Sequence, residues 1–152
     1  DEIRSMFPYT ALITPEGFAL EDGKWVSLEE FANLPAPQRD YYVKYSGSDL
    51  ALNWGSKGVY HARTLSKPQT AKLFEEIAGG FRTGRFWTIQ KSHLSEGETV
   101  RYISREGGEV ESAAHSKFSA FYGPDGLMGI LLMQRPFHKV HGSPSTIFNI
   151  CT

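Results

Sequence analysis

Cysteine is nearly absent from this sequence, and neither sign of charge is in excess. The single Cys151 excludes an intramolecular disulfide, which is compatible with a reducing cytoplasm. The formal net charge of −1 provides no bulk attraction to nucleic acid or to an anionic membrane. The apolar runs fall well short of the roughly 20 residues that span a bilayer. We therefore expect a cytoplasmic protein that binds neither nucleic acid nor membrane.

A secretory signal is also lacking, because the chain opens with the polar sequence Asp-Glu-Ile-Arg. An initiating methionine is missing from the same position. These two features favour a piece of a longer chain. The composition that remains, with 152 residues of which 40% are hydrophobic and 22% charged, is ordinary for one globular domain with a sizeable core.

Two helices are predicted from capping signals. Ser27 with Glu30 three residues later resembles the start of a short helix. Ser66 followed by Pro68 begins a longer one, in which apolar residues recur at helical spacing. The pair Gly79-Gly80 is expected to close this principal helix.

Strands are predicted where apolar runs are separated by glycine-containing turns. The expected strand segments are 8–14, 18–20, 24–26, 41–44, 59–64, 85–91, 99–104, 110–111, 117–122, 127–135 and 145–150. Strands, one principal helix and then an antiparallel run form an α+β pattern with antiparallel sheets.

The stretch from Tyr41 to Tyr60 carries the first candidate site. A strand ending on Lys44 leads into a loop rich in glycine and serine, and a second strand follows. Glycines such as Gly47 and Gly58 permit positive φ and let a ligand approach the backbone. Successive backbone N–H groups in such a loop can bind an anion, and Lys57 places a cation beside it. Phosphate suits this chemistry best, and the alternative is an ordinary hairpin with a long ordered loop.

An ATP site needs a cation near the phosphates, a loop to cover them and an apolar slot with a hydrogen-bonding edge. Lys44 and Lys57 supply the first and the loop from Ser46 to Ser56 the second. The strand end Ile89-Gln90-Lys91 supplies the third.

This order of features resembles the ATP-grasp family. Its members have a strand ending on lysine (here Tyr41-Tyr42-Val43-Lys44), a glycine-rich loop (Gly47 to Gly58), then a helix and a strand that frames adenine (Trp87 to Lys91). The segment from Gly129 to Arg135 is similar to the family's glycine-led strand that ends on arginine, and Asn149 to its late asparagine. Within the family the chain looks most similar to the carboxylate–amine ligases of the circularly permuted, glutathionylspermidine-synthase-like branch.

The resemblance implies an ATP-grasp-like fragment of a larger fold. It divides the chain into an N-terminal hairpin region (1–40), a nucleotide-binding lobe (41–91) and a C-terminal antiparallel sheet (92–152). The implied function is the ATP-binding region of a ligase that forms peptide bonds through an acyl phosphate. The rest of a larger ligase chain is then a partner, and an incomplete domain with exposed apolar strands could form a homodimer.

The resemblance also implies roles for individual residues. Lys57 and Arg135 would stabilise the transferring phosphoryl group, and Asn149 would help to hold Mg²⁺. The residues implied to bind ATP are Lys44, Gly47, Gly55, Ser56, Lys57, Gly58, Gln90 and Lys91.

The chain departs from the family pattern near the metal. The family places an Asp or Glu two residues before its asparagine, where this chain has Ile147, and another acid on the preceding strands, where it has His115, Ser116 and Lys117. Mg²⁺ prefers carboxylate oxygens. The alternative is therefore a non-catalytic module on the same fold that binds a nucleotide or a partner.

Other chemistries find less support. Lys44-Tyr45-Ser46-Gly47 is similar to the Lys-x-Asp-Gly motif of polynucleotide ligases, but serine replaces the acid. His138 and His141, three apart, would face opposite sides of a strand, so we expect no shared metal. The remaining histidines are expected at the surface or in hydrogen bonds. Cys151 at the chain end has no signature of a nucleophile.

Overall fold

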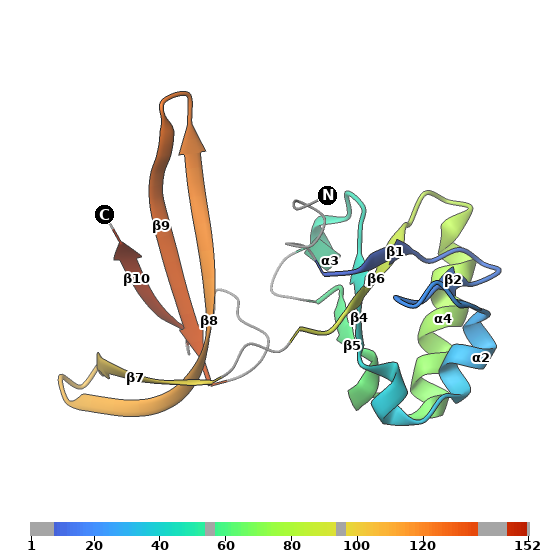
Figure 1. The fold of residues 1–152 in the computed structure, drawn as a ribbon, viewed down its shortest axis with the longest axis horizontal. Helices are drawn as coiled ribbons and strands as arrows, with labels where there is room; N and C mark the ends of the chain where they lie inside the picture. The colour runs from blue at the N-terminus through green and yellow to red at the C-terminus, as the bar shows by residue number, and fades with distance from the viewer. Residues whose placement is uncertain (1–7, 54–56, 94–96, 137–145, 152) are drawn as a thin grey trace. The chain divides into compact units, whose positions relative to one another are not determined.

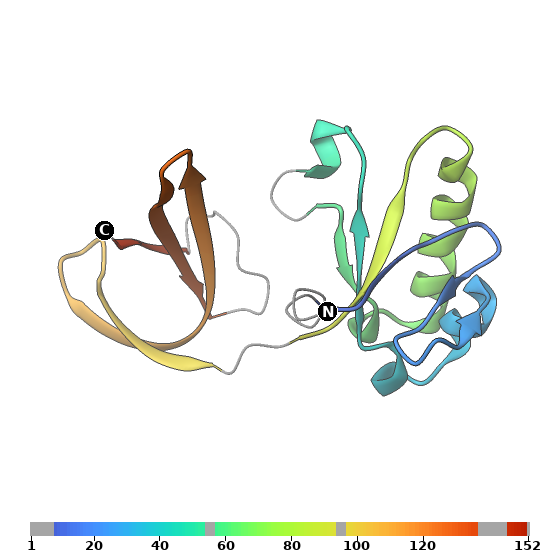
Figure 2. The ribbon, with the colours of Figure 1, turned by 45° about the horizontal axis from the view of Figure 1, so that its top comes forward.

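The structure is a computed structural model that describes residues 8–53, 57–93, 97–136 and 146–151. The chain divides into two compact units, Asp1–His93 and Leu94–Thr152. Figures 1 and 2 show both units. The fold is mixed α+β with antiparallel sheets, as the sequence predicts. None of the described helices is long and apolar enough to cross a membrane.

Unit one is built on a four-stranded antiparallel sheet with the strand order β1-β6-β4-β5. Its strands are β1 (Thr10–Leu12), β4 (Tyr41–Tyr45), β5 (Val59–His61) and β6 (Trp87–Lys91). A separate hairpin pairs β2 (Phe18–Ala19) with β3 (Trp25–Val26). The turn of this hairpin contains Gly23 at φ +82°, a left-handed value suited to glycine.

The helices of unit one are α2 (Leu28–Asn33), α3 (Leu50–Asn53), α4 (Lys67–Phe81) and the 3₁₀ turns η1 (Ala36–Arg39) and η2 (Ala62–Thr64). Both predicted helix starts are confirmed. Ser27 with Glu30, and Ser66 with Gln69, form complete capping boxes. The two longer helices, α2 and α4, lie on the same side of the sheet (Figure 1).

The core lies between the sheet and these helices. Val43 on β4 and Ile89 on β6 are paired across the strands and are both 0% exposed. Phe18, Phe31 and Phe74 pack over them as mutually edge-on or tilted rings, with centroids 5.1–5.9 Å apart. The buried residues come from the hairpin, from α2 and α4 and from the sheet, so the core ties these elements together.

Arg39 connects the segment before β4 to α4. Its guanidinium is buried and donates to the Thr70 hydroxyl and, at 2.9 Å, to the Leu65 carbonyl. These bonds join η1 to the turn that precedes α4 and to the helix's first turns. The arginine therefore helps to place the strand that follows it, β4.

Unit two is an antiparallel sheet in the order β10-β9-β8-β7. Its strands are β7 (Glu98–Ile103), β8 (Glu109–Gly123), β9 (Gly126–Arg135) and β10 (Ile147–Cys151). The sequence predicts two short strands where the structure has one 15-residue β8. The first half of β8 pairs with β7 and the second half with β9, so the strand continues while its partner changes.

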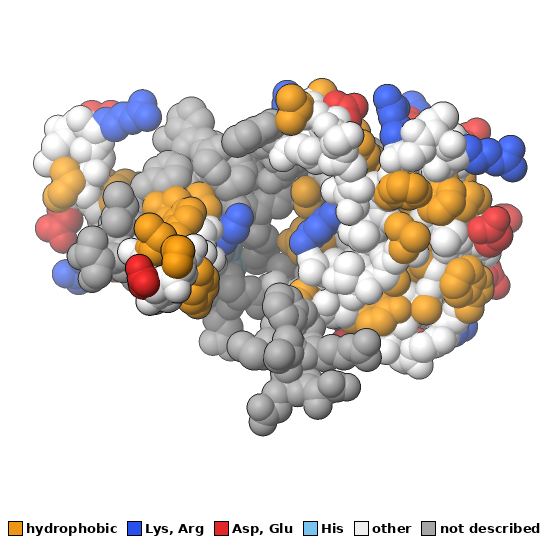
Figure 3. All heavy atoms as spheres, turned by 90° about the horizontal axis from the view of Figure 1, so that it is seen from above, with side chains coloured by type: hydrophobic (Ala, Val, Ile, Leu, Met, Phe, Trp, Pro, Cys, Tyr) orange, Lys and Arg blue, Asp and Glu red, His pale blue; other side chains and the backbone are white. Residues whose placement is uncertain are grey.

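The end of the β8–β9 hairpin exposes large apolar side chains. The exposed fractions are 73% for Tyr122, 55% for Leu127 and 76% for Met128. Figure 3 shows apolar side chains gathered over this hairpin. Its turn is held by Gly126 at φ +113°, a left-handed value suited to glycine.

The end of α4 differs from the prediction. The helix continues through Gly79 and Gly80 to Phe81, and neither glycine has positive φ. The left-handed position falls later, at Gly84 with φ +78°. Local sequence identified the region of the stop, but the chain reverses one turn further on, where the Arg85 backbone N–H donates to the Gly80 carbonyl.

We expect Gly79→Ala to stabilise unit one by about 1 kcal/mol, because this exposed helical position gains an alanine without a clash. A Cβ at Gly79 would meet nothing within 4 Å. Gly80→Ala is the matched control and should gain less, because its Cβ would lie 3.2 Å from that of Arg85. Urea unfolding followed by circular dichroism measures both, and equal gains would contradict the packing described at Gly80.

The capping box of α2 should make stability depend on pH. The backbone N–H of Ser27 donates to the Glu30 carboxylate at 2.8 Å and lowers the pKa of Glu30 below its ordinary 4.5. A carboxyl whose pKa is lower in the folded state stabilises above its unfolded pKa, and this contribution is lost as the pH falls through the folded pKa.

Glu30→Gln should therefore be less stable than the wild type at neutral pH, with the difference shrinking as the pH falls below about 4. Unfolding midpoints measured across this range test it. Glu29→Gln, in the same helical turn but outside the capping box, is the control. A pH-independent difference for Glu30→Gln would show that the carboxylate charge is not what the cap uses.

Candidate functional site

Two rows of residues cross the sheet of unit one on the face opposite α4. Directly paired residues of antiparallel strands lie on the same face, so the register defines each row. The first row holds Thr10, Gln90, Tyr42 and His61, and the second holds Leu12, Thr88, Lys44 and Val59. We call these eight residues the outer sheet face. It carries most of the polar side chains of the four strands.

Lys44 and Gln90 come together on the outer sheet face. They are 46 residues apart in sequence, and the Lys44 ammonium donates directly to the Gln90 side-chain oxygen. The Gln90 amide nitrogen donates in turn to the Thr10 hydroxyl at 3.2 Å. Lys44 Nζ also lies 5.8 Å from the centre of the Tyr42 ring, within range of a cation–π interaction. One cation, one amide and one aromatic face therefore occupy neighbouring positions.

His61 closes the first row. Its ring stacks on Tyr42, with centroids 4.6 Å apart and planes inclined by 22°, and its Nε2 lies 2.8 Å from Asp40 Oδ1. This confirms the expectation of a hydrogen-bonded histidine. Burial raises the pKa of the Tyr42 phenol above its ordinary 10.0. The Tyr42 ring therefore has two neighbours, the stacked His61 ring and the Lys44 ammonium.

Hydrogen bonds order the first part of the loop after β4, from 46 to 53. The Asp49 carboxylate accepts from the Ala51 backbone at 2.9 Å and starts α3, a helical turn that the sequence analysis missed. Asn53 then donates to the Gly47 carbonyl at 2.9 Å. The signal for α3 was the Asp49 cap, hidden among glycines and serines that indicate loop.

The two described glycines of this loop serve packing and not positive φ, which corrects the sequence interpretation. A Cβ at Gly58 would lie 2.8 Å from the Leu52 carbonyl oxygen and 2.8 Å from the Cβ of Tyr45. A Cβ at Gly47 would lie 2.3 Å from the Tyr45 hydroxyl. The loop folds back on Tyr45 so closely that only glycine fits at both positions.

The other predicted phosphate-loop residues are placed only in part. Lys57 is exposed directly before Gly58 at the end of the loop, where its ammonium reaches solvent. Gly55 and Ser56 lie outside the described residues. Gly47, Lys57 and Gly58 thus belong to the loop that joins β4 to β5 and follows Lys44 in the sequence.

Lys91 lies apart from Lys44 and Gln90. It is paired with Tyr41, not with a residue of the outer sheet face. Its ammonium lies 4.8 Å from the centre of the Tyr41 ring and 3.9 Å from a Glu21 oxygen. The alternation of side chains along β6 separates it from its neighbour Gln90.

Arg135 and Asn149 belong to unit two. Arg135 is buried at the end of β9, where it pairs with His115 of β8. Asn149 pairs with Leu132, and its side chain is outside the described part of the structure. The pair His138 and His141 also lies outside the described residues. Among the residues that are described, no three or more His, Cys, Asp or Glu side chains gather as metal ligands would.

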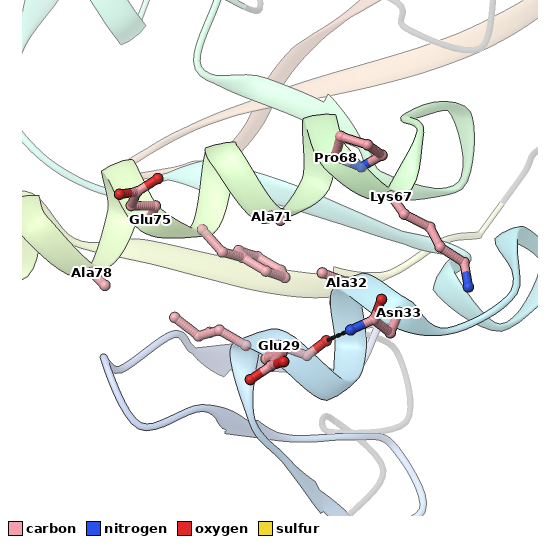
Figure 4. Close-up of a pocket in the computed structure, with 10 residues that line it drawn as sticks. Glu29, Ala32, Asn33, Lys67, Pro68, Ala71, Glu75 and Ala78 are labelled. Atoms are coloured by element: carbon pink, nitrogen blue, oxygen red, sulfur yellow. Dashed lines mark hydrogen bonds between the residues drawn. The ribbon is translucent and has the colours of Figure 1, made fainter.

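A groove of about 400 Å³ lies on unit one between α2 and α4. Figure 4 shows the small side chains Ala32, Ala71 and Ala78 lining it, with Glu29 and Glu75 at its rim. The lining is mostly apolar, and its two carboxylates, Glu29 and Glu75, outnumber its cation, Lys67, so the groove's charge does not favour an anion. The outer sheet face is therefore the better candidate for binding an anionic ligand.

Sequence reasoning missed Thr10, Tyr42 and His61 as members of this face. A threonine near the start of the sequence and a histidine after a tyrosine carry no motif. Only the strand register aligns them with Gln90. Tyr42 could have been found from alternation, because it lies two residues before Lys44 on the same face of a strand.

Comparison with protein-family models, with curated proteins and with solved structures gave no match. The candidate site therefore depends on the geometry of this chain alone.

Gly58→Ala should destabilise unit one by about 1–3 kcal/mol, because the new methyl group overlaps a backbone carbonyl that cannot move independently. Urea unfolding measures the loss. Gly79→Ala, where a methyl group meets nothing within 4 Å, is the control. An unchanged midpoint for Gly58→Ala would show that the loop does not pack closely on Tyr45.

Proposed function

We propose that unit one binds a nucleotide, ATP, across its outer sheet face, as the ATP-binding region of an ATP-dependent carboxylate–amine ligase. The observation that carries this proposal is the direct bond between Lys44 and Gln90, which brings a cation and an amide together on the outer sheet face. The ATP-grasp resemblance of the sequence supplies the reaction class.

Each group has a distinct task in this proposal. The Lys44 ammonium neutralises phosphate charge, because a lysine is a compact point charge with three donors. The Gln90 amide offers both a donor and an acceptor to the edge of a base. The Tyr42 ring supplies an apolar flank, and the exposed Lys57 supplies a second cation from the loop. Together these groups give the proposed site a charged end for the phosphates and a hydrogen-bonding end for the base.

The proposed reaction has two steps. A substrate carboxylate oxygen attacks the γ-phosphorus of ATP, giving an acyl phosphate and ADP. An amine then attacks the acyl carbon, and inorganic phosphate leaves as the amide forms. Lys57 of unit one is the proposed stabiliser of charge on the phosphoryl group.

Mg²⁺ enters this proposal as the counter-ion of ATP, which brings its own phosphate oxygens as ligands. Asn149 is the residue of this chain proposed to assist. Two residues before Asn149, where the family has an Asp or Glu, this chain has Ile147. The strand therefore offers no carboxylate to the metal at that position.

Ile147 is also the observation that favours a second candidate, a module that binds a nucleotide or a partner without catalysis. An isoleucine offers no ligand to a metal that would complete phosphoryl transfer. The two candidates share the same nucleotide-binding face and differ only in turnover.

Isothermal titration with ATP and Mg²⁺ tests the shared claim. We expect binding by the wild type and at least tenfold weaker binding by Lys44→Ala, since a charge-assisted contact to phosphate is lost. Lys72→Ala, an exposed lysine on α4, is the matched control and should bind as the wild type does.

Absence of ATP binding at millimolar concentration would refute the nucleotide proposal. Binding that Lys44→Ala leaves intact would refute the assigned site. Phosphate release assayed with carboxylate and amine mixtures then separates the ligase from the non-catalytic module. Tight binding without release would favour the module.

A further inference from the structure

A chain of hydrogen bonds crosses three strands of unit one and ends on the lysine of the proposed site. The Thr10 hydroxyl donates to the Pro8 carbonyl at 3.0 Å. It accepts from the Gln90 amide nitrogen at 3.2 Å. The Gln90 amide oxygen accepts from the Lys44 ammonium. Thr10, Gln90 and Lys44 come from β1, β6 and β4 in the order in which these strands lie side by side.

The direction of every bond in this chain is determined by chemistry. An ammonium has donors and no acceptor, so only the oxygen of the Gln90 amide can face Lys44. The amide NH₂ must then face Thr10. The one proton of the Thr10 hydroxyl is used on Pro8, which leaves its lone pairs for Gln90. An amide flipped by 180° would place NH₂ against the ammonium, donor against donor.

The three side chains that form this chain of hydrogen bonds are accessible to a ligand. Gln90 and Lys44 are half-buried and Thr10 is exposed, so the Gln90 oxygen is not sealed in the core. An amide oxygen has two lone pairs, and Lys44 uses one of them. The second is available as a hydrogen-bond acceptor.

We propose that Thr10 is a specificity-determining positioning residue, which through Gln90 keeps an acceptor facing the base and so selects adenine over guanine. This inference rests on the proposed nucleotide binding. The 6-amino group of adenine donates to an acceptor, whereas O6 of guanine is itself an acceptor and is repelled by one. A binding site that presents an unpaired polar atom to the wrong partner loses affinity for it.

Thr10→Val removes the hydroxyl and keeps the shape of the side chain. In the proposed complex Lys44 turns to the phosphates, so Thr10 is the partner that keeps the Gln90 amide in this orientation, and without an acceptor on β1 the amide loses that anchor. Thr10→Ser keeps the hydroxyl and should therefore keep the preference for ATP over GTP. Thr83→Val is the control, because the Thr83 hydroxyl donates at 2.8 Å to the Gly80 carbonyl, away from the sheet.

The measurement is the ratio of affinities for ATP and for GTP, each titrated with Mg²⁺. We expect the wild type to prefer ATP and Thr10→Val to lower that preference about tenfold. Thr10→Ser and Thr83→Val should keep it. A second readout is the NMR signal of the Gln90 side-chain NH₂ group, measured without nucleotide and assigned by its loss in Gln90→Glu. This signal should shift in Thr10→Val and stay unchanged in Thr10→Ser.

Gln90→Glu supplies a second test that holds even if the Thr10→Val variant does not fold. A carboxylate presents acceptors in both positions, so the ATP preference should persist whatever overall affinity it has. A change of preference toward GTP in Gln90→Glu would overturn the inference.

The outcomes separate the two proposals. If the wild type binds ATP and Thr10→Val keeps the full preference, the positioning role is wrong and nucleotide binding stands. If the wild type binds neither ATP nor GTP, nucleotide binding falls and base selection falls with it.

Discussion

The antiparallel pairing of β4 with β6 is the constraint on which the rest of unit one depends. It sets Val43 opposite Ile89 in the core, where both are fully buried, and Tyr42 opposite Gln90 on the outer sheet face. A shift of register by one residue would move every side chain to the other face. The burial of one aliphatic pair therefore determines where the polar pair lies. The same pairing that stabilises the fold places the candidate site.

The two faces of this sheet have separate tasks. Phe31 and Phe74 pack over one face and make it the stable side of the unit, since well-packed aromatic side chains bury large areas. The other face is free to carry charge, because Lys44 can reach solvent beside its partner. The loop after β4 is tied back to Tyr45 by close glycine packing. A ligand on this face would thus meet Lys44 and Gln90 already bonded to each other.

The proposed ligand binding and the proposed turnover draw on different residues of this chain. The proposed binding uses the cation, the amide and the aromatic flank, which unit one holds within three adjacent strands. Arg135 and Asn149, which the family resemblance associates with turnover, belong to unit two. Glu98, Ser116 and Gln134 form a hydrogen-bonded cluster across β7, β8 and β9 there. Unit two therefore has polar order of its own, apart from the residues carried over by resemblance.

The sequence alone determined the α+β class, both helix starts and the positions of most strands. These features follow from signals within a few residues, such as the reach of Ser66 to Gln69. Tertiary structure decided the rest: that α4 passes through two glycines and that β8 is continuous. It also brought Thr10 to Gln90, 80 residues away. Strand register depends on which distant side chains are buried together, and no local signal carries that information.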